Sequence, residues 1–502
     1  MRVLFGAQGG MLSVLQEIDV LLRKDDFIED SAYWISDAEY YYRKKNSLPL
    51  KNVTECFEWD YTKGVKIPEE RKTEILNKYK SFNLWDAIVA DRRLMFGKST
   101  KYRQQYACKF TDEQLYNIVI ATLSALDELV IKFSPNVIVT FVPATFGDYL
   151  LYYVAKANNV DYRQLRSTKI VNYMILSRNF GAVSDEIDQQ YKLNMLHEDY
   201  NYAQEAGEYI EKASAAPMVY EGSLKKGKIS LFNQVHSLAY SFLAAAKKKF
   251  SSVNKFARTD NHVPPPFSLF FYGQLLAPYN RRRANSAMKP RMISLDDAKN
   301  TDYVFFPLHS EPEIAISVNG RNYQNQIEAI RRIAQSLPIG WTLVVKEHPR
   351  SFAYRTVGYY KKLMEIPNVR FAAVEVQPYY WIKHSKAVTT ISGFVGFEAV
   401  VVGKPVIVLG DVMFKQIPDT MLRTIDGFTH FFDELLSLLE EYRYDPKPIK
   451  AYIAACMEKG VSLNMYSVLL SKSGRESMGD GQDINTEYER MAQYFKSSLA
   501  MN

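Results

Sequence analysis

The sequence predicts an α/β fold with two doubly wound, Rossmann-like domains and an added helical segment between them. Short apolar runs alternate with helical patterns in both halves of the chain, which is typical of parallel sheets covered by helices on both faces. The length of 502 residues suits two or three domains, and a hydrophobic content of 47% is enough for sizeable cores. We expect a first domain at 1–183, the helical segment at 184–295, a second domain at 296–425, and C-terminal helices at 426–502 that pack back on the domains.

The first half of the chain supplies the clearest alternation. Strands are expected at 3–5, 32–35, 136–141 and 161–165, and helices at 69–80, 84–96, 112–133 and 145–157. The second domain is expected to contain strands at 303–306, 341–346, 369–373, 387–391 and 405–409, with helices at 321–336, 377–384 and 394–402. Between the two, residues up to about 250 have a helical pattern, and 254–291 has the character of a linker because it is rich in proline and arginine with little periodicity.

Cysteine usage and the absence of targeting signals predict a cytoplasmic protein. Cys56, Cys108 and Cys456 are few and far apart, which argues against a disulfide framework and fits a reducing compartment. The N-terminus enters a strand pattern at once and lacks the apolar region of a signal peptide. No stretch of about 18 apolar residues occurs, so no transmembrane helix is expected.

Positive charge is concentrated in one segment of the chain. Residues 222–291 contain thirteen Lys or Arg and a single acid, Asp260, which gives that segment a charge of +12 in a chain whose total is +7. Such a segment suggests an anionic partner. No nucleic-acid recognition motif accompanies it, so a nucleic acid is not the expected partner.

A helix expected at 227–250 inside this segment allows two interpretations. Its apolar residues form a wide face, with lysines at both ends, including Lys247, Lys248 and Lys249. One interpretation is an ordinary packed helix with solvated lysines. The other is a surface helix that lies on the anionic inner leaflet of the plasma membrane, helped by basic residues through 225–291, which would make the protein peripheral to that membrane.

Polar residues follow two strands of the second domain at the edge where ligands of open parallel sheets bind. Lys346 and His348 follow one strand, and Ser392 and Gly393 follow another, directly before a helix. The amide groups at such a helix start favour a phosphate. Glu398 lies further along that helix, where a carboxylate can accept ribose hydroxyls. The structural alternatives are a plain helix cap and a loop histidine.

Four sequence elements occur in order in this half, at 306–313, 346–349, 389–399 and 403–406. Together they resemble the capsule polysaccharide biosynthesis proteins, a family that includes the Kdo transferases that build the lipid-linked base of bacterial capsules. The clear resemblance covers about residues 300–415. Residues 84–92 of the first domain look like a further family element, and the rest of that domain matches in patches.

The resemblance implies a glycosyltransferase of the two-Rossmann-domain (glycosyltransferase-B) architecture with a CMP-linked sugar donor. It implies that His348 contacts the donor phosphate, that Thr390 and Ser392 form a hydroxyl pair on that phosphate, and that Glu398 holds the ribose. His309, Lys346 and Gly393 belong to the same family elements and join the predicted donor site. The acidic Glu347 departs from the family pattern, in which proline often precedes the histidine.

Candidate catalytic residues come from both domains. Asp148 follows a predicted strand of the first domain, where a general base could take the proton of an acceptor hydroxyl; the alternative is a helix first-turn Asp. Glu311 and Glu313 follow the first strand of the second domain and could orient the sugar or its acceptor, or form only a rigid loop. Asp91 is a weaker candidate. The Gly-rich turn at 6–10 is interpreted as an acceptor-facing loop.

The sequence therefore predicts a cytoplasmic glycosyltransferase of capsule or surface polysaccharide biosynthesis. Its partners would be a nucleotide-sugar donor, with a Kdo-like sugar on CMP as one candidate, and a glycan or glycolipid acceptor. No metal ion or resident cofactor is expected, since no Asp-x-Asp motif lies near the strand ends and a monophosphate leaving group needs a metal less than a diphosphate does. A nucleotide-sugar 2-epimerase and a non-catalytic glycan-binding protein of capsule assembly or export remain as alternatives.

Overall fold

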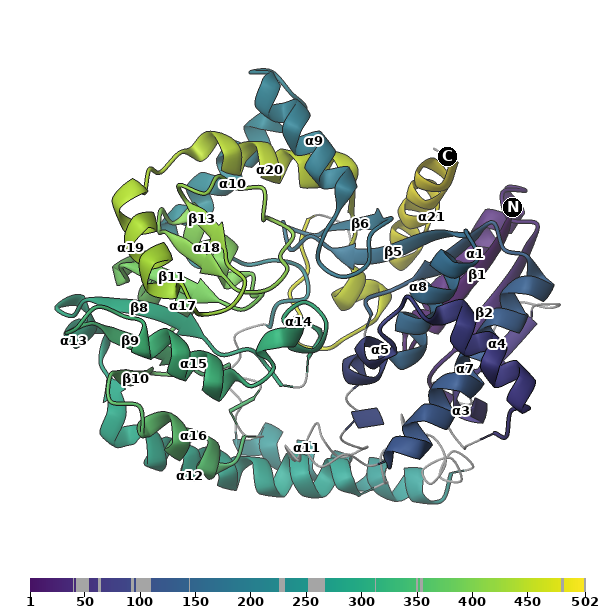
Figure 1. Ribbon diagram of the computed structural model, residues 1–502, viewed down its shortest axis with the longest axis horizontal. Coiled ribbons are helices and arrows are strands. Elements are labelled where there is room, and N and C mark those ends of the chain that lie inside the picture. The colour runs from purple at the N-terminus through teal and green to yellow at the C-terminus, as the bar shows by residue number, and fades with distance from the viewer. Residues whose placement is uncertain are drawn as a thin grey trace. The chain divides into compact units, whose positions relative to one another are not determined.

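The computed structural model describes residues 1–38, 40–41, 54–61, 65–91, 94–95, 110–143, 145–224, 231–251, 267–311, 313–348, 351–352, 355–479 and 483–500. The chain forms two compact units. Unit 1 comprises Met1–Phe180, Tyr220–Gln274 and Gly460–Asn502, and unit 2 comprises Gly181–Val219 and Leu275–Lys459. Each unit contains one seven-stranded sheet with helices on both faces (Figure 1), which confirms the expected α/β fold with two doubly wound sheets.

The sheet of unit 1 is parallel through its first five strands. The strands are β1 (Arg2–Ala7), β2 (Asp30–Ile35), β3 (Thr54–Phe57), β4 (Val137–Thr140), β5 (Asp161–Ser167), β6 (Tyr173–Ser177) and β14 (Val461–Ser462). Their spatial order is β14-β6-β5-β4-β1-β2-β3, and β6 pairs antiparallel with both β5 and β14. The strand β14 brings the C-terminal part of the chain into this sheet.

Alternate residues of the unit 1 strands point into two different cores. Val3 and Phe5 pack with α1 (Met11–Lys24) and α21 (Ile484–Ala500) on one face, while Leu4 packs with α7 (Asp112–Phe133) and α8 (Phe146–Ala157) on the other. The strand period of two places successive side chains on opposite faces, so a central strand buried on both sides is apolar throughout. Shorter helices complete the second face: α3 (Glu58–Tyr61), α4 (Glu69–Tyr79) and α5 (Leu84–Ala90).

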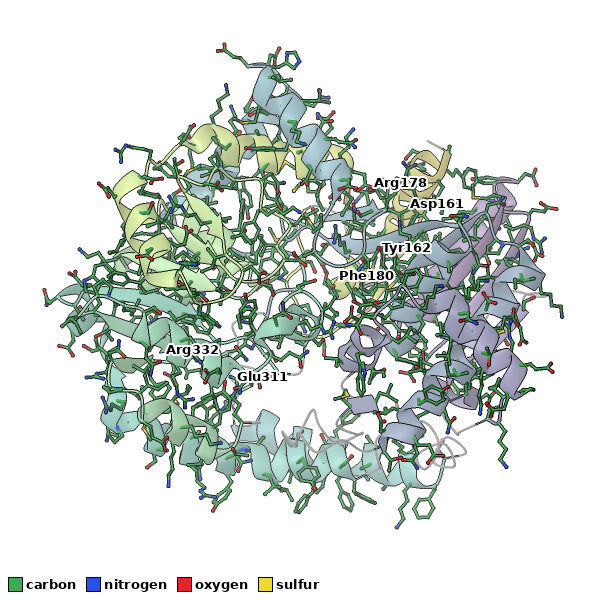
Figure 2. All side chains as sticks on the ribbon, viewed as in Figure 1. Asp161, Tyr162, Arg178, Phe180, Glu311 and Arg332 are labelled. Carbon is green, nitrogen blue, oxygen red and sulfur yellow. The ribbon has the colours of Figure 1, made fainter. Side chains whose placement is uncertain are left out.

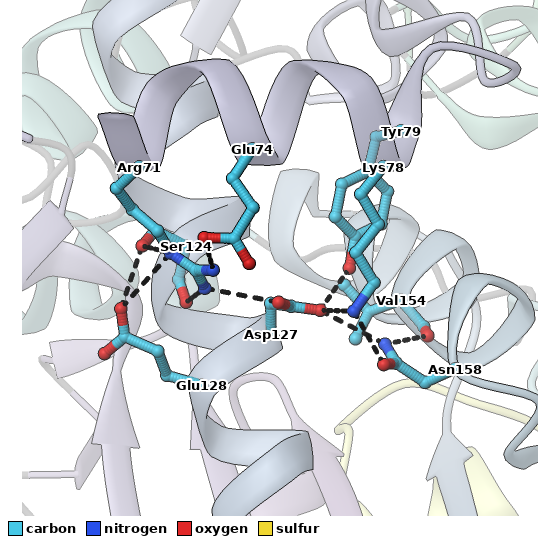
Figure 3. A network of polar contacts seen from close by, with 9 residues as sticks. All are labelled: Arg71, Glu74, Lys78, Tyr79, Ser124, Asp127, Glu128, Val154 and Asn158. Atoms are coloured by element: carbon cyan, nitrogen blue, oxygen red, sulfur yellow. Dashed lines mark hydrogen bonds and ion pairs between the residues drawn. The ribbon is translucent and has the colours of Figure 1, made fainter. Parts of the chain in front are cut away.

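A buried carboxylate ties three helices of unit 1 together (Figure 3). The Asp127 side chain on α7 is fully buried and accepts hydrogen bonds from Lys78 Nζ at 2.5 Å and Tyr79 Oη at 2.9 Å, both on α4. It also accepts one from Asn158, directly after α8, at 3.3 Å, and pairs with Arg71 at 3.2 Å. Burial alone would raise the pKa of Asp127, but its donors outweigh burial and lower that pKa.

Helix α7 is the one described helix that is long and apolar enough, by length and composition, to cross a membrane. Its most apolar window has a mean hydropathy of 1.3, and 67% of that window is buried inside the protein. Leu123 and Leu126 lie in the core between the sheet and α8. Packing within unit 1 therefore accounts for its apolar composition.

The sheet of unit 2 is parallel in every described pairing. Its strands are β7 (Met292–Ile293), β8 (Tyr303–Pro307), β9 (Thr342–Lys346), β10 (Val369–Ala372), β11 (Ala387–Thr390), β12 (Val406–Val408) and β13 (Leu422–Thr424). The spatial order is β13-β12-β11-β8-β9-β10-β7.

Helices cover both faces of this sheet. One face packs on α12 (Ala277–Met288), α15 (Gln326–Gln335), α16 (Val357–Met364) and α19 (Phe431–Glu441). The other face is covered by α17 (Pro378–His384) and α18 (Val395–Val401), and α20 (Pro446–Lys459) packs on α18. Short helices α13 (Leu295–Lys299) and α14 (Ile314–Ser317) connect the strands.

Each sheet has one point at which the chain changes direction across the strand order. In unit 1 the chain runs from β1 to β2 and β3 on one side, then returns to β4 on the other side of β1. In unit 2 it runs from β8 to β9 and β10, then returns to β11 on the other side of β8. These switch points lie between β1 and β4 and between β8 and β11.

The segment expected as a separate helical region and linker is divided between the units. Helices α9 (Asp185–Leu196) and α10 (Ala203–Ala215) pack on α20 in unit 2, while α11 (Leu231–Lys249) lies in unit 1. The linker interpretation of 254–291 is wrong for residues 277–288, which form α12 and pack on α16. Only Ala284 and Met288 of α12 are buried, so its apolar stripe was too narrow to see in the sequence.

Candidate functional site

The loops after β8 and β11 meet at the switch point of unit 2. The backbone N–H of Ser392, after β11, donates to Nε2 of His309, after β8, at 3.3 Å. The Thr390 hydroxyl lies 3.5 Å from the same nitrogen. A backbone N–H can only donate, so Nε2 is the acceptor in this contact. Open α/β sheets bind ligands beside such switch points, at the carboxyl ends of their strands.

Gly393 allows this close approach. A Cβ atom at this position would lie 2.9 Å from Thr390 Oγ1 and 3.1 Å from His309 Nε2, tighter than ordinary contacts. The Gly393 N–H donates to Thr390 Oγ1 at 3.2 Å, and the Ser392 hydroxyl donates to the carbonyl of Ala315 at 2.5 Å. The amide and hydroxyl groups predicted to bind a phosphate thus have protein partners in this structure. A bound phosphate would have to exchange with them.

The backbone of His309 is held from two sides. Gln326, on α15, accepts from the His309 N–H at 2.8 Å and donates to the His309 carbonyl at 3.2 Å. Arg355 donates to the same carbonyl at 2.5 Å. Sequence reasoning did not identify Gln326 or Arg355, since both reach the site from distant positions in the chain. The imidazole of His309 consequently projects from a rigid backbone.

Arg355 belongs to a fully buried ion cluster. Its guanidinium pairs with the Glu347 carboxylate and lies 3.5 Å from Glu311 Oε1, and Glu347 also accepts from the Tyr360 hydroxyl at 2.7 Å. Burial alone would lower the pKa of Arg355, but the two carboxylates outweigh it and hold that pKa well above the ordinary value. Glu347, the departure from the family pattern, therefore anchors the loop after β9 beneath His309.

The two acids proposed for catalysis in unit 2 lie in different environments. Glu311 (Figure 2) is 6% exposed at its side chain and is engaged by Arg355 and by the Gln326 amide. Glu313 is exposed directly before α14. Glu311 thus contacts the two residues that hold the His309 backbone, Arg355 and Gln326. Glu313 is the acid that is open to solvent.

The remaining predicted donor residues spread along the same edge. Lys346 contacts the loop after β10: its ammonium donates to the carbonyls of Val374 at 2.8 Å and Ala373 at 3.3 Å, and burial lowers its pKa to about 8. His348 and Glu398 are each partly exposed.

The loop that carries His348 contacts the His309 loop through a pair of serines. Ser351 donates its N–H to the His348 carbonyl at 2.9 Å and its hydroxyl to Ser310 Oγ at 2.9 Å. The loops after β8, β9 and β11 are thus connected, and the structure brings His309, Thr390, Ser392 and Gly393 into direct contact.

Unit 1 has an equivalent contact at its own switch point. Gln8, after β1, donates to the Val142 carbonyl at 2.6 Å and to Asp148 Oδ2 at 2.8 Å. Thr145 donates its hydroxyl to the same carboxylate oxygen at 2.6 Å and accepts from the Asp148 N–H at 3.2 Å. Asp148 is 1% exposed. It therefore combines a helix-cap geometry with the position predicted for a base.

Two further buried carboxylates lie beside the start of α8. Glu58 accepts from the indole Nε1 of Trp34 at 3.2 Å, and a Cβ on Gly147 would lie only 2.0 Å from its Oε2. Asp91 accepts from the Phe146 N–H at 3.2 Å, so it caps this helix. Sequence reasoning did not identify Glu58. The one signal for it in the sequence is its position directly after a short strand, β3.

An aromatic group borders this region of unit 1. The rings of Tyr162 and Phe180 (Figure 2) have centroids 6.3 Å apart, and Tyr152 stacks on Phe180 at 4.8 Å. The Tyr162 hydroxyl lies 2.8 Å from Thr140 Oγ1 at the end of β4. Aromatic rings and hydroxyls thus surround the end of β4.

Residues 210–425 match the sequence model of a family described as capsule polysaccharide biosynthesis protein. This range contains all four sequence elements noted above and every strand of the unit 2 sheet. Residues 210–425 are therefore similar in sequence to the capsule polysaccharide biosynthesis family. The match confirms the resemblance drawn from the motifs, and the Ser392–His309 contact lies within the matched part of the chain.

Comparison with solved structures gives distant similarities. A KpsC β-Kdo 2,7 transferase of Thermosulfurimonas dismutans is 10% identical, with 80% of this chain and 95% of that chain covered and a TM-score of 0.32. A KpsC β-Kdo 2,4 transferase of the same organism is 12% identical, covering 69% and 94%, at 0.30. A UDP-GlcNAc 2-epimerase of Neisseria meningitidis is 12% identical, covering 100% of both chains, at 0.29. No curated protein matches the sequence.

Proposed function

We propose that this protein is a glycosyltransferase of capsule or surface polysaccharide biosynthesis. In this proposal it transfers a sugar, with a Kdo-like sugar as the first candidate, from a CMP-activated donor to a glycan or lipid-linked acceptor. The observation that carries it is the contact between Ser392 and His309 at the switch point of unit 2, inside the region that matches the capsule biosynthesis family. A switch point is where a doubly wound sheet binds a nucleotide.

His309, Ser392 and Gly393 would bind the donor phosphate. The amides of Ser392 and Gly393 donate to His309 Nε2 and Thr390 Oγ1, at 3.3 and 3.2 Å. A phosphate oxygen is a stronger acceptor than either, because hydrogen bonds to charged groups are shorter and stronger. When a phosphate takes the Ser392 amide, His309 Nε2 can take a proton from solvent and share it with a phosphate oxygen in a hydrogen bond, without transferring it.

This exchange would stabilise the leaving nucleotide. Negative charge develops on the phosphate as the bond to the sugar breaks, and donors already held in position stabilise such charge most effectively. Gln326 and Arg355 hold the His309 backbone, so the imidazole needs little rearrangement. We propose no resident metal ion or cofactor for this step.

Asp148 is our proposed general base for the acceptor hydroxyl. Its Oδ2 is oriented by Gln8 at 2.8 Å and Thr145 at 2.6 Å, at the switch point of unit 1. Oriented carboxylates within reach of a hydroxyl typically accelerate proton transfer by about 10²–10⁴-fold. Because the side chain is 1% exposed, the acceptor must displace Gln8 to reach it.

A nucleotide-binding panel tests the donor site. Thermal unfolding of the full chain with CMP, CDP, UMP, UDP and GDP should show stabilisation by CMP, since a ligand at a hundred times its Kd adds about 2.7 kcal/mol to the native state. His309→Ala should remove the CMP effect, and His430→Ala, an exposed histidine before α19, should leave it unchanged. Stabilisation by UDP alone, with release of UDP in the absence of an acceptor, would favour a 2-epimerase. No effect from any nucleotide would contradict the proposal.

A matched pair of substitutions tests the base. Asp297 on α13 repeats the cap geometry of Asp148, because Ser294 donates to its Oδ2 at 2.6 Å and accepts from its N–H at 3.1 Å. Asp148→Asn should lower turnover of CMP-sugar by about 10²–10⁴-fold without changing CMP affinity, while Asp297→Asn should leave turnover unchanged. Equal turnover in both variants would make Asp148 a helix cap only.

A further inference from the structure

The outward side of α11 (Leu231–Lys249) carries large apolar side chains that are exposed to solvent. Tyr240 is 69% exposed, Leu243 is 66% exposed, and Phe250, directly after the helix, is 86% exposed. With Lys247 they are spaced three, four and three positions apart, so they lie on one side of the helix. We refer to Tyr240, Leu243, Lys247 and Phe250 as the α11 face.

The opposite side of α11 makes the contacts that hold the helix in unit 1. Ala245 and Lys248 are buried, and the Ser241 hydroxyl accepts from Gln274 Nε2, in the π-helix Leu269–Leu276, at 3.0 Å. Phe242 also contacts Phe270, with ring centroids 5.4 Å apart. Ala245 and Lys248 thus lie on the packed side and Phe242 makes ring contacts beside it, while the large apolar residues of the α11 face point outward.

This arrangement is the reverse of a packed helix with solvated lysines. In such a helix Leu243 would be buried and Lys248 exposed, whereas Leu243 is 66% exposed and Lys248 is 8% exposed. Exposed apolar residues that occur singly need no explanation, but three large ones on one side of a helix indicate a surface that binds something. The side chains of 231–237 and the lysines at 225, 226 and 228 lie outside the described residues.

The charge around the α11 face is positive. Lys247 and Lys249 are both exposed, and Lys249 Nζ lies 5.8 Å from the ring centroid of Phe267. No Asp or Glu occurs between Glu221 and Asp260 in the sequence. The residues Arg281–Arg283, which the sequence places in the same basic segment, lie on α12 of unit 2 and are not part of the α11 face.

We propose that the α11 face binds an anionic membrane surface. Aromatic and leucine side chains enter the boundary between lipid headgroups and acyl chains, and neighbouring lysines are attracted to anionic headgroups. The α11 face combines both features on one helix, with the lysines at the end that also carries Phe250. A nucleic acid would bind the lysines but would leave Leu243 and Phe250 without a role. A lipid surface accounts for both the lysines and the exposed apolar side chains. This inference does not depend on the nucleotide specificity of unit 2.

Vesicle flotation of the full chain tests this proposal. The chain should float with vesicles of equimolar phosphatidylglycerol and phosphatidylcholine, bind little to phosphatidylcholine alone, and lose binding as salt rises, because salt screens surface charge. Lys247→Glu with Lys249→Glu should weaken binding by at least about tenfold, since each basic residue near an anionic lipid surface contributes about a factor of five. Leu243→Ser with Phe250→Ser should also weaken binding.

Matched variants separate the α11 face from general effects of charge and hydrophobicity. Lys212→Glu with Lys447→Glu makes the same charge change on exposed positions of α10 and α20, and Leu196→Ser with Ile339→Ser removes two other exposed apolar residues. Both control pairs should float like the unaltered chain. Equal flotation with neutral vesicles, flotation with neither lipid, or equal weakening by the control pairs would overturn the proposal. Self-association of the unaltered chain that the α11 variants abolish without any lipid binding would identify a second copy as the partner instead.

Discussion

The substitution Gly393→Ala gives a quantitative test of the packing at the unit 2 switch point. The added Cβ would lie 2.9 Å from Thr390 Oγ1 and 3.1 Å from His309 Nε2. Neither neighbour can move easily, because Thr390 is fully buried in β11 and the His309 backbone is held by Gln326 and Arg355. Adding a methyl group to a site that cannot relax costs about 1–3 kcal/mol. Movement of His309 away from the added methyl group should also separate it from Ser392. CMP binding should then weaken by at least about tenfold, which corresponds to about 1.4 kcal/mol and lies in the lower part of that range.

Gly358→Ala is the matched control, because it adds the same methyl group where there is room for it. Gly358 lies in α16, and its Cβ would have Thr356 Oγ1 as its nearest neighbour at 3.8 Å. Alanine should stabilise this helix by about 0.5–1 kcal/mol relative to glycine. The assay is urea unfolding of the full chain, combined with calorimetric titration of CMP. If Gly393→Ala is as stable as Gly358→Ala and binds CMP like the unaltered chain, the inferred tight contact at the switch point is wrong.

Two further predictions concern buried charges. Burial lowers the pKa of Lys346 from 10.5 to about 8, so the native state disfavours the charged form and stability should rise as the pH rises between these two values. Urea unfolding across this range should show a smaller rise for Lys346→Met, and an unchanged slope would contradict the prediction. The donors to Asp127 lower its pKa, so its contribution is present above the unfolded pKa and is lost as pH falls below it. Asp127→Asn should destabilise the chain by about 1–3 kcal/mol at neutral pH, because the hydrogen bonds to a charged group are weakened while Lys78 and Arg71 remain partly exposed to water. The comparison is Asp112→Asn at the exposed start of α7, and an equal effect of both would show that the network contributes little.

The fold and the edge of the sheet that carries the site could be predicted because they depend on local patterns. Apolar runs such as those of β8 and β11 are bounded by polar residues, and the carboxyl ends of parallel strands always share one edge. The residues after β9 and β11, His348 and Ser392, could therefore be placed at one edge of the sheet. The expectation that these two strands are adjacent is wrong, because β8 lies between them, and Ser392 contacts His309 after β8 at 3.3 Å.

The distant partners of side chains could not be predicted in the same way. Val345 faces the core on one side of the sheet, so Lys346, as the next residue of β9, points to the opposite side and reaches the carbonyl of Val374. The pairing of Arg355 with Glu347 depends on a loop path that no local pattern specifies.

Helix α12 illustrates a different difficulty. Its proline lies in the first turn, where proline is tolerated, and only two of its residues are buried. The sequence signals of a linker and of a thinly buried helix are therefore similar in this segment.

Hydrogen exchange with and without CMP tests most directly whether the switch point of unit 2 is the nucleotide site. The amides of Ser392 and Gly393 should become more protected in the CMP-bound chain, together with the loop after β8 that contains His309, because these groups would bind the phosphate. Peptides from α19, which carries no predicted donor residue, should exchange at the same rate in both states. Protection confined to unit 1, or no change at 309 and 392–393 under saturating CMP, would contradict the account.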